Sequence, residues 1–433
     1  MGYDGSRQER KGDMEGRPGT QRPQGVETLA VFGGPPAFDT VLHVGRPNLG
    51  DRAYLLQRIH EALDRRWLTN GGPLVLEFER EVARVAGTRH CVALCSGTMA
   101  LEIAVRAAGL RGEVIVPSFT FVATAHALQW QGITPVFCDI DPGTHTIDPE
   151  RVEERITGRT SGIIGVHTWG RPCDVDALTD VAKRNGLVLL FDAAHAFGCS
   201  AAGRMIGGFG RAEIFSFHAT KFVNCLEGGA VVTDDDAMAA SARLMRDFGF
   251  VEMDTVAGLG TNGKMNEFSA AMGLTTLRSM EAIVAHNREV YRAYRKGLAG
   301  LGALRLIEYD ESEKGNYQYI VVEVDEKAAG LSRSELLVLL HAENVLARRY
   351  FFPGCHRMEP YRTARPEGGA RLPQTERLVE RVLVLPTGEV VSVEHAEAIC
   401  GILRTALENA PVVREKIEGH LRAGKPSPWL PEA

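Results

Sequence analysis

The chain has 433 residues, of which 44% are hydrophobic and 24% are charged, so it is long and apolar enough to fold as two globular domains. Its formal net charge is -6, and its lysines and arginines form no basic block, which argues against a partner such as nucleic acid or a membrane surface. No apolar run reaches the ~18 residues that would span a bilayer, so no membrane segment is expected.

The first 25 residues are polar and glycine-rich, and they lack the apolar core of an export signal. We therefore expect residues 1–25 to form a disordered tail and the protein to be cytoplasmic. The eight cysteines include no C-x-x-C pair, and several lie in apolar runs. They are expected to be reduced core residues, and no metal site is predicted.

Short apolar runs rich in β-branched residues alternate with segments of helical period between residues 85 and 235. This alternation is typical of a mostly parallel sheet with helices on both faces. It predicts a large α/β domain, which we place at residues 26–285. The predicted strands are residues 90–95, 113–116, 134–138, 162–166, 187–191, 213–217 and 229–233.

The pattern becomes helical at residues 265–285 and 287–299. A strand-like run at 319–323 and an amphipathic segment at 333–343 follow. These elements predict a smaller C-terminal α+β domain, residues 286–415, joined to the first by a long helix. The remaining residues, 416–433, are expected to form a loose tail.

Side chains with useful chemistry follow four of the predicted strands. The first strand turns through Gly97 into a helix, where free backbone N–H groups, the helix dipole and the hydroxyl of Thr98 would bind an anion. One glycine and one threonine before a helix are a weak signal alone. Phe121 follows the second strand, and its flat ring would stack on a cofactor ring, although an aromatic residue after a strand is more often part of the core.

The other two strand ends carry charge. Asp192 directly ends an apolar strand, where a carboxylate is costly to bury without a positive partner. A protonated pyridine nitrogen would be such a partner, and a simple helix cap is an equally good explanation. Lys221 lies between a buried strand and a Gly-Gly turn, where partial desolvation would lower the pKa of its amine and make it a nucleophile towards an aldehyde. Considered alone, an ordinary surface lysine is the better explanation.

The four features gain weight because they occur together. Ligands of open α/β sheets bind at the carboxyl ends of the strands, so an amine, a carboxylate, an anion cradle and a stacking ring would converge on one crevice. Together they predict a pocket for pyridoxal 5'-phosphate. The G-x-G-x-x-G match at residues 258–263 follows no clean buried strand, so a dinucleotide site is not expected.

From about residue 30 to 405 the chain resembles the DegT/DnrJ/EryC1/StrS family of sugar aminotransferases. The resemblance implies the fold-type I, aspartate aminotransferase-like architecture. It also implies that Lys221 is the Schiff-base lysine and proton shuttle, that Asp192 pairs with the pyridine nitrogen and that Phe121 stacks on the ring. The motifs that carry it lie at residues 96–98, 117–121, 192–195, 216–221 and 227–229.

Further cofactor contacts are implied by the same resemblance. Gly97, Thr98 and Ser216 match residues that hold the phosphate, and His195 matches a position beside the ring. Residues 260–265 are similar to the family's G-x-N-x-R-M segment, whose polar residues reach the phosphate of the neighbouring subunit's site. Asn262 and Lys264 therefore imply an obligate homodimer with shared active sites.

Within the family, the chain is most similar to the nucleotide-sugar 4-aminotransferases of antibiotic deoxysugar pathways, those of desosamine and calicheamicin biosynthesis. The implied reaction converts dTDP-4-keto-6-deoxy-D-glucose to dTDP-4-amino-4,6-dideoxy-D-glucose, with L-glutamate as the amino donor. Asn70, in a glycine-rich loop, and Tyr350 and His356, in an aromatic and polar motif, are candidate contacts to the hexose and pyrophosphate. A purely structural role stays open for each. The motifs are residues 45–48, 67–73, 166–173, 350–356 and 385–388.

Alternative functions stay open at this stage. A nucleotide-sugar 3-aminotransferase would differ only in how the hexose is oriented. A related dehydrase carries histidine at the position of Lys221, which argues against dehydration. A non-catalytic regulator that binds the cofactor would tolerate loss of Lys221 or Asp192, and both are present. A generic amino-acid aminotransferase would need an arginine clamp for a second carboxylate, for which there is no candidate.

Overall fold

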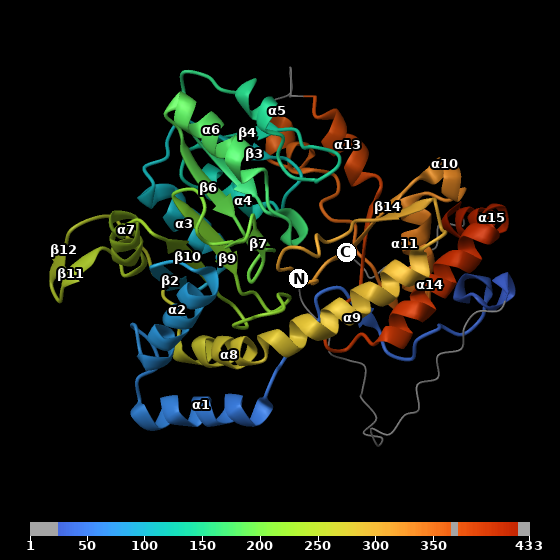
Figure 1. The fold of residues 1–433 in the computed structure, drawn as a ribbon, viewed down its shortest axis with the longest axis horizontal. Helices are drawn as coiled ribbons and strands as arrows, with labels where there is room; N and C mark the ends of the chain where they lie inside the picture. Colours follow the sequence, from blue (N-terminus) through green and yellow to red (C-terminus); the bar gives the residue numbers. More distant parts are fainter. Residues whose placement is uncertain (1–24, 365–370, 423–433) are drawn as a thin grey trace.

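The computed structural model describes residues 25–364 and 371–422, and its larger half is built on a seven-stranded sheet (Figure 1). The strand order is β2-β10-β9-β6-β5-β3-β4. Only β10 runs antiparallel to its neighbours in this sheet, so the predicted mostly parallel α/β fold is confirmed. The strands are β2 (His90–Leu94), β3 (Glu113–Pro117), β4 (Thr134–Cys138), β5 (Thr160–Val166), β6 (Val188–Asp192), β9 (Ala212–Ser216) and β10 (Gly229–Thr233).

The sheet is covered on both faces, as its continuous apolar strands require. In β2, Cys91 and Ala93 pack into one core cluster, whereas Val92 and Leu94 pack into another. The first cluster lies under α2, α6 and α8, and the second under α3, α4 and α7. The helices of this half are α1 (Arg52–Arg65), α2 (Pro73–Ala86), α3 (Gly97–Ala107), α4 (Ala123–Gln129), α5 (Pro149–Glu153), α6 (Val175–Asn185), α7 (Asp236–Arg246) and α8 (Glu267–Arg278).

The smaller half contains a three-stranded antiparallel sheet of order β13-β14-β16, packed with helices around its own core (Figure 1). The predicted strand at 319–323 and helix at 333–343 correspond to β14 and α11. The elements of this half are β13 (Leu304–Leu306), β14 (Ile320–Val324), β16 (Val382–Leu385), α9 (Met280–Leu298), α10 (Glu326–Ala329), α11 (Arg333–Ala342), α14 (Val393–Glu408) and α15 (Ala410–Arg422). Two short helices pack outside this core: α12 (Tyr361–Ala364) against the cluster under α3 and α4, and α13 (Pro373–Val379) in a separate cluster with Phe119 and Trp169.

The start of the described chain does not belong to the large domain, where the 26–285 boundary placed it. Leu29 and Phe38 are buried in the core of the smaller half, and β1 (Leu42–His43) pairs with β15 (Val345–Leu346). The carboxylate of Glu343 accepts hydrogen bonds from the backbone N–H groups of Ala30 and Ala37, at 2.7 and 2.8 Å. These contacts cover apolar surface that the C-terminal helices would otherwise expose.

Two other boundaries differ from the expectation. The helix break falls at Ser279, between α8 and α9, and not at residue 286, because the backbone N–H of Ser279 closes the last turn on Thr275 and Thr276. Of the expected loose tail at 416–433, residues 416–422 belong to α15, which buries Ile417 in the core, and residues 423–433 lie outside the described residues. Of the expected N-terminal tail, residues 1–24 lie outside the described residues.

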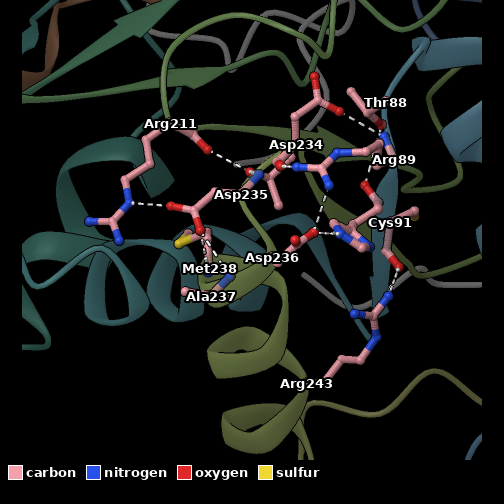
Figure 2. A network of polar contacts seen from close by, with 12 residues as sticks. Thr88, Arg89, Cys91, Arg211, Asp234, Asp235, Asp236, Ala237, Met238 and Arg243 are labelled. Atoms are coloured by element: carbon pink, nitrogen blue, oxygen red, sulfur yellow. Dashed lines mark hydrogen bonds and ion pairs between the residues drawn. The ribbon is translucent and has the colours of Figure 1, made fainter.

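At the amino end of β2, opposite to the ends that carry the predicted site, a polar network joins β2, β10 and α7 (Figure 2). Asp234 accepts a hydrogen bond from the backbone of Arg89 at 2.8 Å, and Arg89 pairs with Asp236 at 2.9 Å. Asp235 caps α7 and accepts a hydrogen bond from Arg211 at 3.1 Å. These side chains are largely exposed, so the ion pairs contribute little to stability individually.

Among the described residues, no helix is long and apolar enough to cross a membrane. All eight cysteines are unpaired, and seven of them are buried. Within the same ranges, no group of three or more His, Cys, Asp or Glu side chains is arranged to hold a metal ion.

Candidate active site

Four strands present the predicted site residues at one edge of the large sheet. Because β2, β3, β6 and β9 all run in the same direction, their carboxyl ends meet at this edge. Gly97, Phe121, Asp192 and Lys221 each follow or end one of these strands. The sheet topology therefore brings together side chains that are far apart in the sequence.

Lys221 lies in the loop between β9 and β10, and its amine points to a tyrosine. The loop is folded back by backbone hydrogen bonds from Lys221 N to His218 O and from Cys225 N to Phe217 O, both 2.8 Å. Lys221 Nζ donates a hydrogen bond to Tyr319 Oη at 3.1 Å. Burial lowers the pKa of the amine to about 8, although the negative charge of Asp192 opposes that shift. The fraction of neutral, nucleophilic amine near neutral pH is therefore far larger than for an ordinary lysine.

Asp192 is the last residue of β6 and is only 5% exposed. Its Oδ2 accepts a hydrogen bond from Thr124 Oγ1 at 2.8 Å, and its Oδ1 accepts one from the backbone N–H of Ala194 at 3.1 Å. Burial raises the pKa of the carboxyl group, and these two hydrogen bonds oppose that shift. A buried carboxylate held in this way is suited to a cationic partner such as a protonated ring nitrogen.

The predicted phosphate contacts come together at the start of α3. Ser96 caps the helix by accepting a hydrogen bond from Met99 N at 3.1 Å, which leaves the first-turn N–H groups of Gly97 and Thr98 without partners inside the helix. A Cβ atom on Gly97 would lie 3.0 Å from Cβ of Ser216, so the glycine allows the end of β9 to approach the helix closely. Together with the exposed Thr98, this arrangement fits an anion at a helix N-terminus.

Phe121 lies on the turn between β3 and α4 and is 60% exposed. Its carbonyl accepts a hydrogen bond from Thr124 N at 3.1 Å, which ties the turn to the residue that holds Asp192. A large aromatic side chain so open to solvent at a strand end is available to stack on a flat ligand.

His195 is partly buried in a set of rings that we call the aromatic cluster. Its ring lies 4.3 Å from that of Tyr319 between centroids and is stacked on Trp169 and Phe351 at 5.8 and 5.9 Å. The backbone N–H of Trp169 points to its Nδ1 at 3.3 Å. Burial, and secondarily the charge of Lys221, holds the pKa of His195 well below its usual value. The cluster consists of Trp169, His195, Tyr319, Tyr350 and Phe351.

Of the three candidate sugar contacts, only Tyr350 belongs to the aromatic cluster. Its ring is stacked on that of Trp169, with the ring centroids 6.1 Å apart. His356 is held against the end of β3, where Ser118 Oγ lies 2.6 Å from its Nδ1 and 3.0 Å from its backbone N. Its Nε2 lies 3.5 Å from Glu376. Asn70 is exposed in the loop between α1 and α2 and adopts a left-handed backbone conformation, with φ of 60°.

Within the described part of the chain, the side chains of Asn262 and Lys264 form no hydrogen bond or ion pair with Lys221 or Asp192. Lys264 Nζ lies 4.5 Å from the ring centroid of Phe248, and the backbone of Asn262 forms an isolated bridge with Asp247. The segment runs beside the end of β2, where Cys95 N donates a hydrogen bond to Gly263 O at 2.8 Å.

The structure adds three residues to which the sequence alone assigned no role. Tyr319 contacts the amine of Lys221, Thr124 holds Asp192, and Trp169 is stacked on His195. Trp169 lies within the motif at 166–173, but nothing in that motif indicates the stacking. Tyr319 comes from the other half of the molecule, just before β14, so no local pattern reveals its contact.

Comparison with known proteins identifies the family of the chain. The model of the DegT/DnrJ/EryC1/StrS aminotransferase family matches residues 51–404. The dTDP-4-amino-4,6-dideoxy-D-glucose transaminase of Escherichia coli is 32% identical over 351 residues, 80% of this chain and 94% of the relative. DesI, solved in the presence of its TDP-sugar product, is 50% identical with a TM-score of 0.87, covering 91% of this chain and 100% of that one.

A further solved structure, NtdA of Bacillus subtilis with bound cofactor PMP, is 26% identical with a TM-score of 0.75, covering 82% of each chain. The matched family region includes the candidate residues from Asn70 to His356. The chain therefore belongs to the DegT/DnrJ/EryC1/StrS aminotransferase family.

Proposed function

We propose that the chain is a pyridoxal-phosphate-dependent aminotransferase that acts on a nucleotide sugar. It transfers the amino group of L-glutamate to C4 of dTDP-4-keto-6-deoxy-D-glucose and forms dTDP-4-amino-4,6-dideoxy-D-glucose. The observation that carries the proposal is the position of the Lys221 amine, with its lowered pKa, at the same sheet edge as the Asp192 carboxylate. The likeness to DesI and to the E. coli transaminase supports the choice of sugar and of C4.

The residues at the sheet edge fit pyridoxal phosphate, whose aldehyde binds an amine and whose ring accepts an electron pair. Gly97, Thr98 and Ser216 hold the phosphate at the start of α3. Phe121 would stack on the ring, and His195 would lie beside it. Asp192 would hold the proton on the ring nitrogen, and its two hydrogen bonds favour the carboxylate form that this role needs.

Lys221 serves the reaction first as the covalent anchor and then as the group that moves a proton. Its amine would take the proton from the α-carbon of glutamate and release it to the former aldehyde carbon of the cofactor, and in the second half-reaction it would move a proton from that carbon to C4 of the sugar. A pKa of about 8 allows the amine to accept and release a proton near neutral pH. One lysine therefore serves both half-reactions, which implies ping-pong kinetics.

The substrate-binding part of the proposal involves loops around the aromatic cluster. Tyr350 contacts the hexose, Asn70 approaches it from the loop after α1, and His356 lies towards the pyrophosphate. Asn262 and Lys264 complete the phosphate site of a second copy in a homodimer, which accounts for their lack of contact with Lys221. We also infer a cytoplasmic location, since eight unpaired thiols suit a reducing compartment.

The test is to incubate the purified protein with L-glutamate and dTDP-4-keto-6-deoxy-D-glucose and to identify the product by mass and by NMR of the sugar. A sugar with nitrogen at C4 supports the proposal. Nitrogen at C3 of a 3-keto substrate, with no turnover of the 4-keto sugar, would replace it with the 3-aminotransferase. A bound cofactor without turnover of either sugar would favour the non-catalytic regulator. Lys221→Ala must be inactive, while Asp236→Asn, in the network of Figure 2, must retain activity.

A further inference from the structure

The contact between Lys221 and Tyr319 joins the two halves of the molecule at the reacting amine. Lys221 belongs to the loop after β9 in the large half, whereas Tyr319 precedes β14 in the small half, 98 residues later. Nζ lies 3.1 Å from Oη, and it also lies 5.9 Å from the centroid of the same ring. The amine is therefore at the hydroxyl end of the tyrosine and not over its face.

Tyr319 is held rigidly in this position. Its backbone N–H donates a hydrogen bond to Tyr309 Oη at 3.1 Å, and that hydroxyl lies 3.1 Å from the carbonyl of Tyr319 and 3.2 Å from that of Trp169. Its ring packs on His195 and Trp169, with centroids 4.3 and 5.5 Å away. With both its backbone and its ring fixed, the tyrosine offers the lysine a fixed hydrogen-bond acceptor.

The protonation state of Tyr319 suits that role. Burial raises the pKa of the phenol well above its usual value, so the hydroxyl remains neutral over the pH range in which the amine titrates. The other titratable groups that interact with the amine are Asp192, whose charge favours its protonated form, and His195, which is neutral. An N–H of the amine can point to Oη whether the nitrogen carries two or three protons.

We propose that Tyr319 is a positioning residue for Lys221. The Tyr319 hydroxyl accepts a hydrogen bond from one N–H of the amine, so that the lone pair of the amine nitrogen faces the carbon from which the proton is taken. The inference rests on the proposed function. Without the hydroxyl, the flexible lysine side chain would sample several rotamers, and the proton would move only from a fraction of them. Because misorientation of a catalytic group slows proton transfer without weakening substrate binding, the effect falls on kcat.

The test compares Tyr319→Phe, which removes the hydroxyl and keeps the ring, with the wild type in each half-reaction. Single-turnover kinetics with glutamate, and then with the keto sugar, are expected to slow by about 10- to 100-fold, with KM changed by less than about twofold. The midpoint of the pH profile for uptake of pyridoxal phosphate by the apoprotein is expected to fall, because the acceptor that stabilises the charged amine is gone. Loss of a merely structural hydroxyl would not move this midpoint.

Tyr294→Phe is the matched control, since the hydroxyl of Tyr294 is also buried and donates to a carbonyl, that of Pro386, at 3.1 Å in the core of the small half. It should leave both the half-reaction rates and the midpoint unchanged. Unchanged half-reaction rates and midpoint in Tyr319→Phe, or equal losses of rate in both variants, would overturn the role of Tyr319 and leave the proposed function intact. A wild-type protein that takes up no pyridoxal phosphate, or that does not react with glutamate, would instead refute the proposed function.

Discussion

Thr124 donates a hydrogen bond to the buried carboxylate of Asp192, with Oγ1 2.8 Å from Oδ2. The Thr124 hydroxyl has one proton, so the neighbouring Thr120 hydroxyl, 2.8 Å away, must donate to it. The result is a directed chain of hydrogen bonds from Thr120 through Thr124 to Asp192. This chain stabilises the carboxylate and so opposes the rise in the pKa of Asp192 that burial causes.

Removing this hydrogen bond should weaken cofactor binding most strongly in acid. In Thr124→Val the pKa of Asp192 rises further, so the carboxylate is protonated at a higher pH and loses its attraction for the ring nitrogen. We expect about a tenfold loss of affinity near neutral pH, from the cost of about 1–2 kcal/mol for losing a hydrogen bond to a charged group. The loss of affinity is measured by equilibrium binding of pyridoxal phosphate over a range of pH. Thr124→Ser, which keeps a hydroxyl, should remain near wild type, and identical profiles for both variants would contradict the prediction.

The pKa of Lys221 predicts how fast the apoprotein takes up its cofactor. Only the neutral amine attacks the aldehyde, so the initial rate should rise with pH and level off above the pKa of about 8. Asp192 raises that pKa by its charge, so Asp192→Asn should move the midpoint to lower pH. The measurement is the initial growth of the visible absorption band at saturating cofactor. As a control, Asp236→Asn removes a carboxylate from the opposite end of the sheet and should leave the midpoint unchanged. A midpoint that rises in Asp192→Asn would refute the conclusion that the charge of Asp192 raises the pKa of Lys221.

Phe119 and Phe121 allow a matched comparison of a core ring with a candidate ligand-stacking ring. Phe119 is fully buried against Trp169 and Phe351, whereas Phe121 is 60% exposed. Phe119→Ala should lower the free energy of unfolding by about 3–5 kcal/mol, and Phe121→Ala by less than about 0.5 kcal/mol. Phe121→Ala should instead weaken cofactor binding by about three- to tenfold, the value of an aromatic stack. Denaturant unfolding of the apoprotein and cofactor titration separate the two effects, and an unchanged cofactor affinity in Phe121→Ala would remove that residue from the site.

The sequence was most informative where local patterns determine structure. The seven strands of the large sheet were predictable because each is a short apolar run, and Thr134–Cys138 and Gly229–Thr233 have the predicted bounds. The convergence of Asp192 and Lys221 followed from the direction of parallel strands. Both predictions rest on the sheet itself, which is specified by burial on its two faces.

Contacts between the two halves were not predictable from the same patterns. The sequence around Tyr319 predicts only an ordinary strand residue, because its contact with Lys221 depends on how the small half packs on the large one. Likewise, residues near Leu29 and Phe38 show no helical or strand period, so their place in the C-terminal core could not be inferred. Ser279 breaks the predicted helix within an otherwise continuous helical pattern, because its turn closes on preceding carbonyls.

The proposed sharing of active sites between two copies makes a quantitative prediction for mixed dimers. Lys221→Ala removes the amine, and Asn262→Asp places a negative charge where the neighbouring copy would bind phosphate, so each homodimer should be nearly inactive. In a mixed dimer, the copy that keeps Lys221 receives an unchanged Asn262 from its neighbour and has one complete site. Random reassociation of equal amounts should then restore about a quarter of wild-type activity, since half of the dimers are mixed and each has one working site of two.

The control for that experiment mixes Lys221→Ala with Asp192→Asn, two changes that fall in the same copy's site. A mixed dimer of these variants has no complete site, so no activity should return. If Asn262 instead acted within its own chain, the first mixture would also stay inactive, because each copy would carry one damaged site. Activity after mixing therefore decides whether the exposed side chain of Asn262 completes the site of a second copy.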